Sequence, residues 1–317
     1  MIHTVQFSSF PIYDDIEFIK NNFKTVKDKY NNLIYTWQYK QLVFQYFQEF
    51  NILLTKVNLN KLINKDIITD TDYQEVNEMI HNQFYEVFNF TDITTLNRID
   101  FKQDIVTDHK DLYIKLLKKC SNNYRYLKQY NKYKTSVYYN SKSTNINIYD
   151  KEQELIDTDI NHITDINKYK NVIRFEVQMK RNKLYYIEHT EGICRELINY
   201  FTEKDRDYYL NKNLKNLIYN GDYYNAYHSK KVLQEYYTNS TVNKLIELQK
   251  LISKVGVYKA KENYNQATFR NYINKLQDVN VNPILIPKNE GINKLEALFN
   301  FTDKNIYLAD NFNLKAA

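Results

Sequence analysis

The sequence predicts an α+β fold, in which an antiparallel sheet with flanking helices precedes a mostly helical C-terminal region. Segments with strand-like alternation gather before residue 180, whereas helical periodicity dominates from about residue 193 onward. Strand-rich sequence followed by helical sequence is typical of α+β proteins. The 317 residues are enough to bury a proper core. We therefore expect an α+β domain over residues 1–239 and a helical region over residues 240–317.

The N-terminal part mixes both kinds of pattern. Residues 5–10 (VQFSSF) predict a short strand that ends at Pro11. Apolar side chains recur at helical spacing over residues 14–30. Residues 33–47 are rich in aromatic and β-branched side chains, which favours one or two strands. Residues 69–90 carry acidic residues in their first turn and predict a helix.

The middle of the chain is dominated by alternating segments. Residues 94–106 predict a strand and residues 109–120 an amphipathic helix. Two further strands are expected at residues 134–139 and 144–151, separated by the polar turn NSKS. Alternation returns at residues 172–180 (VIRFEVQMK) and predicts the last strand of the sheet.

Three of these strands carry polar side chains opposite their apolar ones, because residues two apart in a strand share a face. The polar sets are Arg98, Asp100 and Lys102; Asn145, Asn147, Tyr149 and Lys151; and Arg174, Glu176, Gln178 and Lys180. If the strands are neighbours, Asp100 and Glu176 converge, and two carboxylates make a hard-oxygen site for Mg²⁺ or Mn²⁺. Lys151 can then neutralise a phosphate. An ordinary solvated sheet face with mixed charges explains the same alternation.

Two adjacent tyrosines, Tyr185 and Tyr186, follow the last strand. A tyrosine hydroxyl can attack a phosphodiester and keep the nucleic acid covalently attached. Its ordinary pKa near 10 requires help from a metal or a cation. The chain holds 31 tyrosines, and residues 138–139, 208–209, 223–224 and 236–237 are also pairs, so adjacency alone does not single out this pair.

Composition sets broad limits on function. The formal charge of +6, from 44 basic and 38 acidic residues, allows a polyanionic partner without requiring one. Two cysteines lack the number and spacing of a disulfide framework or a zinc site. The N-terminus does not have the pattern of a secretory signal, and no apolar run approaches the length of a membrane span. We expect a cytoplasmic protein with no membrane partner.

The C-terminal region predicts two amphipathic helices, at residues 245–256 and 265–281, with Gly256 ending the first. Such a pair can place basic residues on DNA, as helix-turn-helix proteins do. The basic residues expected there are Lys254, Lys259, Lys261, Arg270 and Lys275. A packed helical appendage explains the pattern equally well.

The order of three motifs adds a resemblance. NRIDF (97–101), SVYYNSKSTNINIYDKEQEL (136–155) and VIRFEVQMK (172–180) resemble, in this order, the replication initiators of the filamentous-phage gene II/X family. They are also similar to the plasmid Rep_trans rolling-circle initiators. Residues 253–283 look like the C-terminal segment of the gene II proteins, so the resemblance covers about residues 94–283.

The resemblance implies a metal-dependent, site-specific DNA endonuclease and strand transferase of the bacterial host cytoplasm. By this likeness residues 1–239 form the nickase and origin-binding domain. By this likeness Asp100 and Glu176 are metal ligands for Mg²⁺ or Mn²⁺, Lys151 contacts phosphate, and Tyr185 or Tyr186 is the nucleophile. The expected partner is a replication origin, as single-stranded or supercoiled DNA, with host replication proteins acting afterwards. The DNA-contacting residues expected with it are Arg98, Tyr149, Arg174, Lys180 and Arg270.

Two features keep other functions open. Many rolling-circle enzymes carry a His-hydrophobe-His metal motif, which the six histidines of this chain do not form. Either carboxylates hold the metal, or the site is not catalytic. A non-catalytic DNA-binding protein for replication control or repression would use the same sheet face and basic helices. A structural protein with incidental basic charge is a third possibility.

Overall fold

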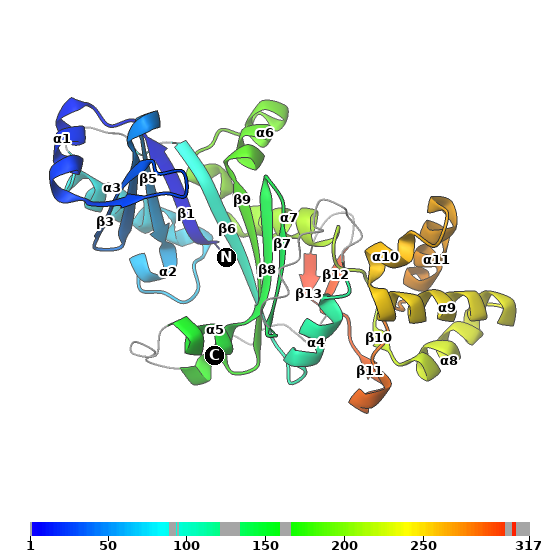
Figure 1. Cartoon of the computed structure of the whole chain (residues 1–317). Coiled ribbons are helices and arrows are strands. Elements are labelled where there is room, and N and C mark those ends of the chain that lie inside the picture. The colour runs from blue at the N-terminus through cyan, green and yellow to red at the C-terminus, as the bar shows by residue number, and fades with distance from the viewer. Residues whose placement is uncertain are drawn as a thin grey trace. The chain divides into compact units, whose positions relative to one another are not determined.

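The computed structural model describes residues 2–88, 93, 95–120, 134–158, 166–301 and 306–308. It confirms the expected α+β class, with a large antiparallel sheet, flanking helices and a helical C-terminal region (Figure 1). No helix among these residues is long and apolar enough to cross a bilayer.

The main sheet has nine strands (Figure 1). In the order in which they lie side by side they are β2 (Lys24–Lys27), β3 (Leu33–Tyr39), β4 (Leu42–Phe47), β5 (Ile52–Asn58), β1 (Ile2–Ser9), β6 (Thr95–Val106), β9 (Val172–Lys180), β8 (Thr144–Asp150) and β7 (Ser136–Asn140). The motif-bearing strands β6, β9 and β8 are therefore consecutive, as the polar-face argument required.

The helices include short and long ones (Figure 1). They are α1 (Tyr13–Asn22), α2 (Leu59–Leu62), α3 (Tyr73–Tyr85), α4 (Lys110–Leu117), α5 (Lys151–Thr158), α6 (Arg181–Glu191), α7 (Glu203–Leu214), α8 (Ala226–Tyr236), α9 (Asn239–Val255), α10 (Val257–Lys261) and α11 (Gln266–Asp278). Short 3-10 turns lie at Gln48–Phe50, Asp70–Asp72, Ile166–Tyr169, Leu197–Tyr200 and Lys288–Glu290. Four minor strands are β10 (Tyr223–Tyr224), β11 (Lys294–Leu295), β12 (Phe299–Phe301) and β13 (Ile306–Leu308).

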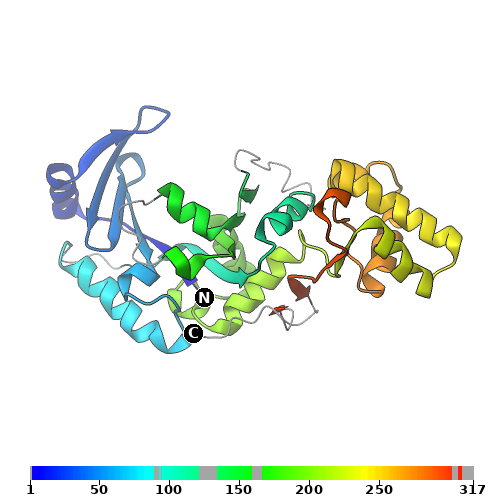
Figure 2. The ribbon, with the colours of Figure 1, turned by 90° about the horizontal axis from the view of Figure 1, so that it is seen from below.

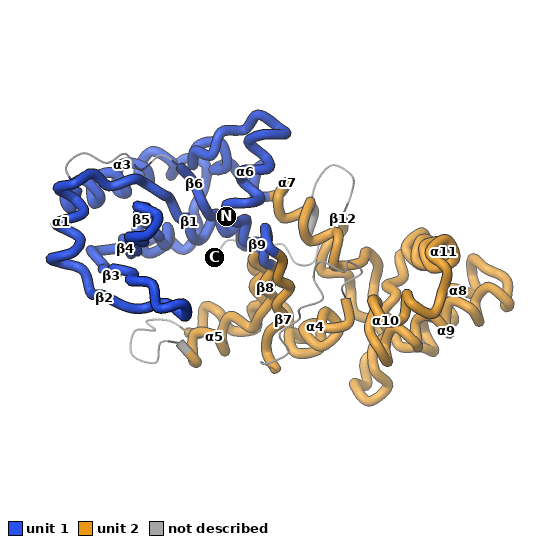
Figure 3. The backbone as a smooth tube through the Cα atoms, turned by 45° about the horizontal axis from the view of Figure 1, so that its top comes forward, with its two compact units in different colours: residues 1–102, 142–145, 177–206 blue, residues 103–141, 146–176, 207–317 orange. Residues whose placement is uncertain are grey.

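The chain forms two compact units, coloured separately in Figure 3. Unit 1 comprises residues 1–102, 142–145 and 177–206, and unit 2 comprises residues 103–141, 146–176 and 207–317. Each of β6, β8 and β9 contributes residues to both units, so the units alternate along the sequence.

Unit 1 has an aromatic core that explains where its first helix ends. A helix was expected over residues 14–30, but α1 stops at Asn22 and residues 24–27 form β2 instead. Phe23 leaves the helix with extended backbone, and its buried ring lies 5.2 Å from the Trp37 ring and 6.0 Å from the Phe44 ring. Burying this ring and pairing β2 with β3 outweigh the helical periodicity of the segment.

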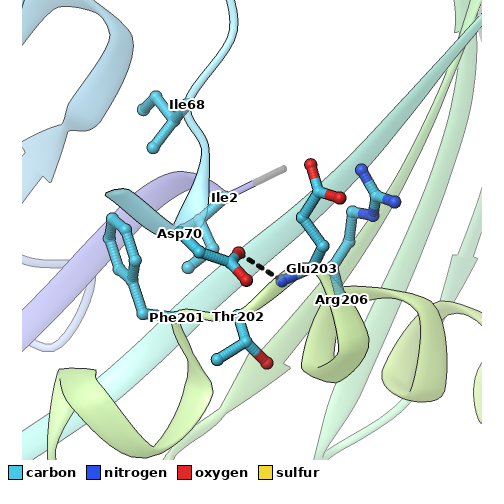
Figure 4. A pocket seen from close by; sticks show the side chains of 7 residues that line it. All are labelled: Ile2, Ile68, Asp70, Phe201, Thr202, Glu203 and Arg206. Carbon is cyan, nitrogen blue, oxygen red and sulfur yellow. Dashed lines mark hydrogen bonds between the residues drawn. The ribbon is translucent and has the colours of Figure 1, made fainter. Parts of the chain in front are cut away.

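A second link within unit 1 fixes the start of α7. The Glu203 backbone N–H donates to the Asp70 carboxylate over 2.6 Å, which supplies an acceptor to an otherwise unpaired helix-terminal donor (Figure 4). Asp70, Phe201 and Arg206 border a hollow of about 10 Å³, enough for about one water molecule. The hollow is a packing feature rather than a ligand site.

Unit 2 contains the helical C-terminal region, where α8 and α11 pack on α9 (Figure 1, Figure 2). Its apolar centre is formed by Leu233, Val242, Leu245, Ile246, Leu276 and Val281. Gly256 ends α9 with a positive φ of 84°, and its N–H donates to the Ile252 carbonyl, as the sequence predicted. A tight backbone approach occurs in the same unit, where a Cβ atom on Gly221 would come within 2.6 Å of the Val281 carbonyl carbon.

Candidate active site

The expected site residues fall into both units and are described unit by unit. Unit 1 holds Arg98, Asp100, Lys180, Tyr185 and Tyr186. Unit 2 holds Tyr149, Lys151, Arg174, Glu176 and Arg270.

In unit 1, Asp100 is buried and paired with Arg98 two residues earlier on β6. Arg98 Nε donates to Asp100 Oδ1 over 2.9 Å and Arg98 Nη2 to Oδ2 over 2.5 Å. Asp100 is 3% exposed. Burial raises the pKa of its carboxyl, while the Arg98 guanidinium acts in the opposite direction. The two side chains share one face, as alternation predicted, but the face is buried rather than solvated.

Further polar groups of unit 1 extend this pair. The Gln178 side chain hydrogen-bonds Asp100, and Asn145 Nδ2 donates to Gln178 Oε1 over 3.1 Å. The Lys180 N–H donates to the Ser143 carbonyl, and burial together with the nearby Arg98 lowers the pKa of the Lys180 amine. Asp100 therefore lies among positive charges, which come from Arg98 on β6 and Lys56 on β5.

In unit 2, the buried cation is Arg174. It is 2% exposed, and its Nε and Nη2 atoms donate to the two carboxylate oxygens of Asp104 over 2.6 and 2.7 Å. This bidentate pair raises the pKa of Arg174 against the effect of burial. Sequence reasoning missed Asp104. The signal was present, because position 104 continues the alternation of 98, 100 and 102 on β6.

Glu176 lies in the same unit and accepts a hydrogen bond from a tyrosine. The Tyr149 hydroxyl donates to Glu176 Oε1 over 2.7 Å, and both residues are 8% exposed. Burial and the adjacent carboxylate raise the pKa of Tyr149. Tyr149 thus remains a neutral donor to Glu176 at physiological pH.

Lys151 begins α5, directly after β8, and is also 8% exposed. It forms an ion pair with Glu154, and the Tyr169 ring centroid lies 5.8 Å from its Nζ. Burial and the Arg174 charge lower the pKa of Lys151. Its charge is therefore easier to lose than that of an exposed lysine.

A cavity of about 560 Å³ borders this group of unit 2. It is lined by Thr135, Ser136, Tyr138, Tyr149, Asp150, Glu154 and Asp157. The buried Ser136 hydroxyl has no hydrogen-bond partner among the described residues. A molecule in this cavity can therefore reach Tyr149, which contacts Glu176, and Glu154, which contacts Lys151.

Tyr185 and Tyr186 lie on α6, a helix that the sequence did not predict. They are 51% and 56% exposed. The Tyr185 ring stacks on His189 with centroids 3.9 Å apart, and the Lys183 amine lies 5.3 Å from the Tyr186 ring centroid. The guanidinium carbon of Arg195 lies 5.7 Å from the Tyr185 ring centroid, so a cation is close to each of the two rings.

Exposure distinguishes this pair from the other adjacent tyrosines. The pairs 138–139, 208–209 and 223–224 each have one ring that is at most 2% exposed. In the pair 236–237 the second tyrosine is partly buried and its hydroxyl donates to the Lys275 carbonyl. Of the five pairs, only 185–186 presents two exposed tyrosines.

No group of three or more His, Cys, Asp or Glu side chains suited to a metal ion occurs within the described part of the chain. Asp100 and Glu176 offer carboxylate oxygens, which Mg²⁺ and Mn²⁺ prefer. Each carboxylate, taken within its own unit, suits such an ion by its chemistry, but Arg98 now occupies oxygen atoms of Asp100 and Tyr149 occupies one of Glu176. Arg270 lies on α11 and is exposed.

The site residues thus belong to an α+β protein whose main sheet carries buried, charge-paired polar residues and whose helix α6 carries an exposed tyrosine pair. A family profile for the N-terminal part of the phage replication-associated protein of gene II matches residues 16–200, more than half of the chain. The chain belongs to this family of filamentous-phage gene II-type replication initiators. The match confirms the resemblance and extends it into the N-terminal third, whereas residues 253–283 lie outside it. A search of curated proteins finds no match.

Proposed function

We propose that this replication initiator nicks one DNA strand at an origin through a covalent phosphotyrosine and later rejoins that strand. The observation that carries the proposal is the exposure of both Tyr185 and Tyr186 directly after the strand that bears Glu176. A nucleophile must reach a phosphodiester in a large polymer, and a buried ring cannot do so.

In the proposed step, the tyrosine oxygen attacks phosphorus and loses its proton to solvent or a nearby base. The bond from phosphorus to the 3′ oxygen breaks, and that oxygen leaves as a 3′-OH after taking up a proton. The product is a 5′-phosphotyrosine, which keeps the energy of the phosphodiester for rejoining. The 3′-OH primes synthesis by host replication proteins.

The remaining roles follow from charge and position. Lys151 contacts the phosphate, and Arg98, Tyr149, Arg174, Lys180 and Arg270 are the proposed DNA contacts. Among these, Arg270 is exposed and can bind DNA without rearrangement, whereas Arg174 would have to exchange Asp104 for a phosphate. Asp100 and Glu176 are the proposed ligands of Mg²⁺ or Mn²⁺. When bound, the metal polarises the phosphate and makes the tyrosine hydroxyl more acidic.

The test uses supercoiled DNA that carries the protein's own origin, with Mg²⁺ or Mn²⁺. The expected product is a nicked circle with the protein attached to the 5′ end. Tyr185→Phe, Tyr186→Phe and the double variant identify the nucleophile. Tyr227→Phe is the matched control, because Tyr227 is 62% exposed on α8 with Lys231 Nζ 4.6 Å from its ring centroid. A covalent adduct that survives in the double variant excludes both tyrosines.

The second candidate is a non-catalytic DNA-binding replication-control protein of the same fold. The observation that favours it is that Asp100 and Glu176 already have partners, which gives both carboxylates a purely structural role. Tight origin binding without a nick, under every divalent metal, would support it. Asp100→Asn and Glu176→Gln separate the two: loss of nicking with origin binding retained points to metal ligands.

A further inference from the structure

A second cavity, of about 410 Å³, lies within unit 2 and contains none of the residues discussed above. It lies among α4, the start of α8, α9 and the segment that leads into the turn at Lys288–Glu290. Its lining residues are Lys115, Leu116, Lys119, Ala226, Lys250, Ser253, Ile284, Leu285, Ile286, Pro287 and Lys288. The volume is in the range of small-molecule sites.

The charged side chains that line this cavity are all positive. Of the described residues, four lysines line it and no acidic residue does. Lys115 pairs with Glu290, which lies outside the lining and is 25% exposed at its side chain. Lysines brought together around one hollow attract an anion, and the low-dielectric wall beside them strengthens that attraction.

One wall of the cavity is formed by residues 284–287, which belong to no strand or helix but are held in place by hydrogen bonds. The Leu285 N–H donates to Ser253 Oγ over 3.0 Å, and the Ile286 N–H donates to the Tyr224 carbonyl over 2.9 Å. The Ile284 N–H donates to Oδ1 of the fully buried Asn282. A wall fixed in this way loses little entropy on binding a ligand.

The wall is also apolar. Its Ile284, Leu285 and Ile286 are at most 6% exposed, whereas Pro287 is partly exposed and supplies most of the apolar surface that a ligand can reach. A ligand that uses all of this site needs an anionic part for the lysines and a flat or apolar part for the wall. A bare anion would leave the wall uncovered.

We propose that this lysine pocket binds one nucleotide unit, with the phosphate among the lysines and the sugar and base against the wall. The source of the nucleotide is a single DNA strand or a free nucleotide, which share this chemistry. The inference goes beyond the nicking reaction and does not depend on a tyrosine nucleophile or on a metal. It adds a DNA contact in the part of the chain outside residues 16–200.

The experiment measures binding rather than cleavage, so that its failure leaves the nickase proposal untouched. The full chain is titrated with a fluorescent oligothymidylate of roughly 12 nucleotides, a length within the range bound by single-strand sites. The pocket variant is Lys119→Ala with Lys250→Ala. The control is Lys230→Ala with Lys244→Ala, which removes the same charge from exposed positions of α8 and α9 outside the pocket.

The pocket variant is expected to lose about tenfold in affinity and to flatten the salt dependence by roughly 0.7 in the log–log slope, the value for one lost phosphate contact on a single strand. The control is expected to change affinity less than about threefold. Equal losses in both variants, or no loss in the pocket variant, would overturn the proposal.

Two competitors identify the source of the nucleotide. If thymidine monophosphate displaces the oligomer from the wild type and not from the pocket variant, the pocket accepts a free nucleotide. If only the oligomer distinguishes wild type from pocket variant, the pocket holds a unit of a strand. An oligomer of the same length with abasic sugars should bind the wild type more weakly, and unchanged affinity would refute the role of the wall.

Discussion

Arg98 and Asp100 meet through three hydrogen bonds, although they are only two residues apart on one strand: 2.9 Å from Nε to Oδ1, 3.2 Å from Nε to Oδ2 and 2.5 Å from Nη2 to Oδ2. The carboxylate proposed to hold a metal therefore already holds a cation of its own chain. A metal that binds Asp100 has to displace or share it, and the freed guanidinium can then contact phosphate.

The first prediction concerns this pair. Arg98→Met leaves Asp100 buried without its cation and should lower the free energy of unfolding by about 3 kcal/mol at neutral pH. Burial already raises the pKa of Asp100, and the variant raises it further. When the pKa of a carboxyl is higher in the folded than in the unfolded protein, its protonated form stabilises the fold. This stabilisation is complete below the unfolded pKa near 3.9 and is lost as the pH rises through the folded pKa.

The measurement is urea unfolding of Arg98→Met and wild type at pH 5 and pH 7. The deficit of the variant should shrink at pH 5, because protonation removes the unpaired charge. Adding Asp100→Asn should recover part of the loss. A deficit of equal size at both pH values would show that Arg98 stabilises through packing and not through this charge.

The second prediction concerns Arg174 in unit 2. Asp104→Asn removes the countercharge of a guanidinium that is 2% exposed and should cost about 3 kcal/mol of unfolding free energy. Glu86→Gln is the matched control, since its partner Lys40 and Glu86 itself are 48% and 44% exposed at their side chains. In the same urea titration, Glu86→Gln should leave the free energy of unfolding unchanged within error. Similar effects from both variants would contradict the importance of burial.

The third prediction uses the lowered pKa of Lys151. Since burial and Arg174 favour its neutral form, its positive charge is lost as the pH rises through a value below that of an ordinary lysine. Nicking that needs this charge should fall on the alkaline side before exposed lysines titrate. Lys151→Arg should move that fall to higher pH, because arginine stays charged.

Lys180 provides the comparison for this pH profile. Burial and Arg98 lower its pKa as well. If Lys180→Arg moves the alkaline limb and Lys151→Arg does not, the phosphate contact belongs to Lys180.

The fourth prediction concerns two glycines with positive φ in unit 2. At Gly221 a Cβ atom would lie within 2.6 to 2.9 Å of three backbone atoms of residues 280–282, so Gly221→Ala should cost at least about 3 kcal/mol. A Cβ atom on Gly291 would have no heavy atom of the described residues within 4 Å, apart from its chain neighbours. Gly291→Ala should therefore cost about 1–2 kcal/mol from backbone conformation alone. Thermal unfolding should show a larger loss of Tm for Gly221→Ala than for Gly291→Ala. Equal losses of Tm would contradict the close approach at Gly221.

The sequence predicted the positions of strands better than it predicted how deeply their polar side chains are buried. Alternation placed a strand at residues 172–180, and β9 has these bounds. Alternation could not reveal that residues 172–177 are buried on both faces, because the partner of Arg174 is Asp104, 70 positions earlier. Pairing at that distance is set by the tertiary fold and leaves no local periodic signal.

Helix α6 shows a different limit. Only Leu184 and Ile187 of this helix are buried, so its apolar stripe is too short to produce a periodic pattern. The adjacent tyrosines also have strand propensity, which hid the helix. The family could nevertheless be predicted, because it depended on the order of three motifs rather than on any one element.

The pairing of β1 has a consequence for the synthesis of the chain. Val5 pairs with Val57 on one side, whereas Ile2 pairs with Phe101 on the other. At typical translation rates the second edge of β1 stays open on the ribosome for roughly 5–20 s. An open strand edge is a template for association with another chain. Nascent chains that stall before β6 emerges are therefore the species from which aggregates of this protein should grow.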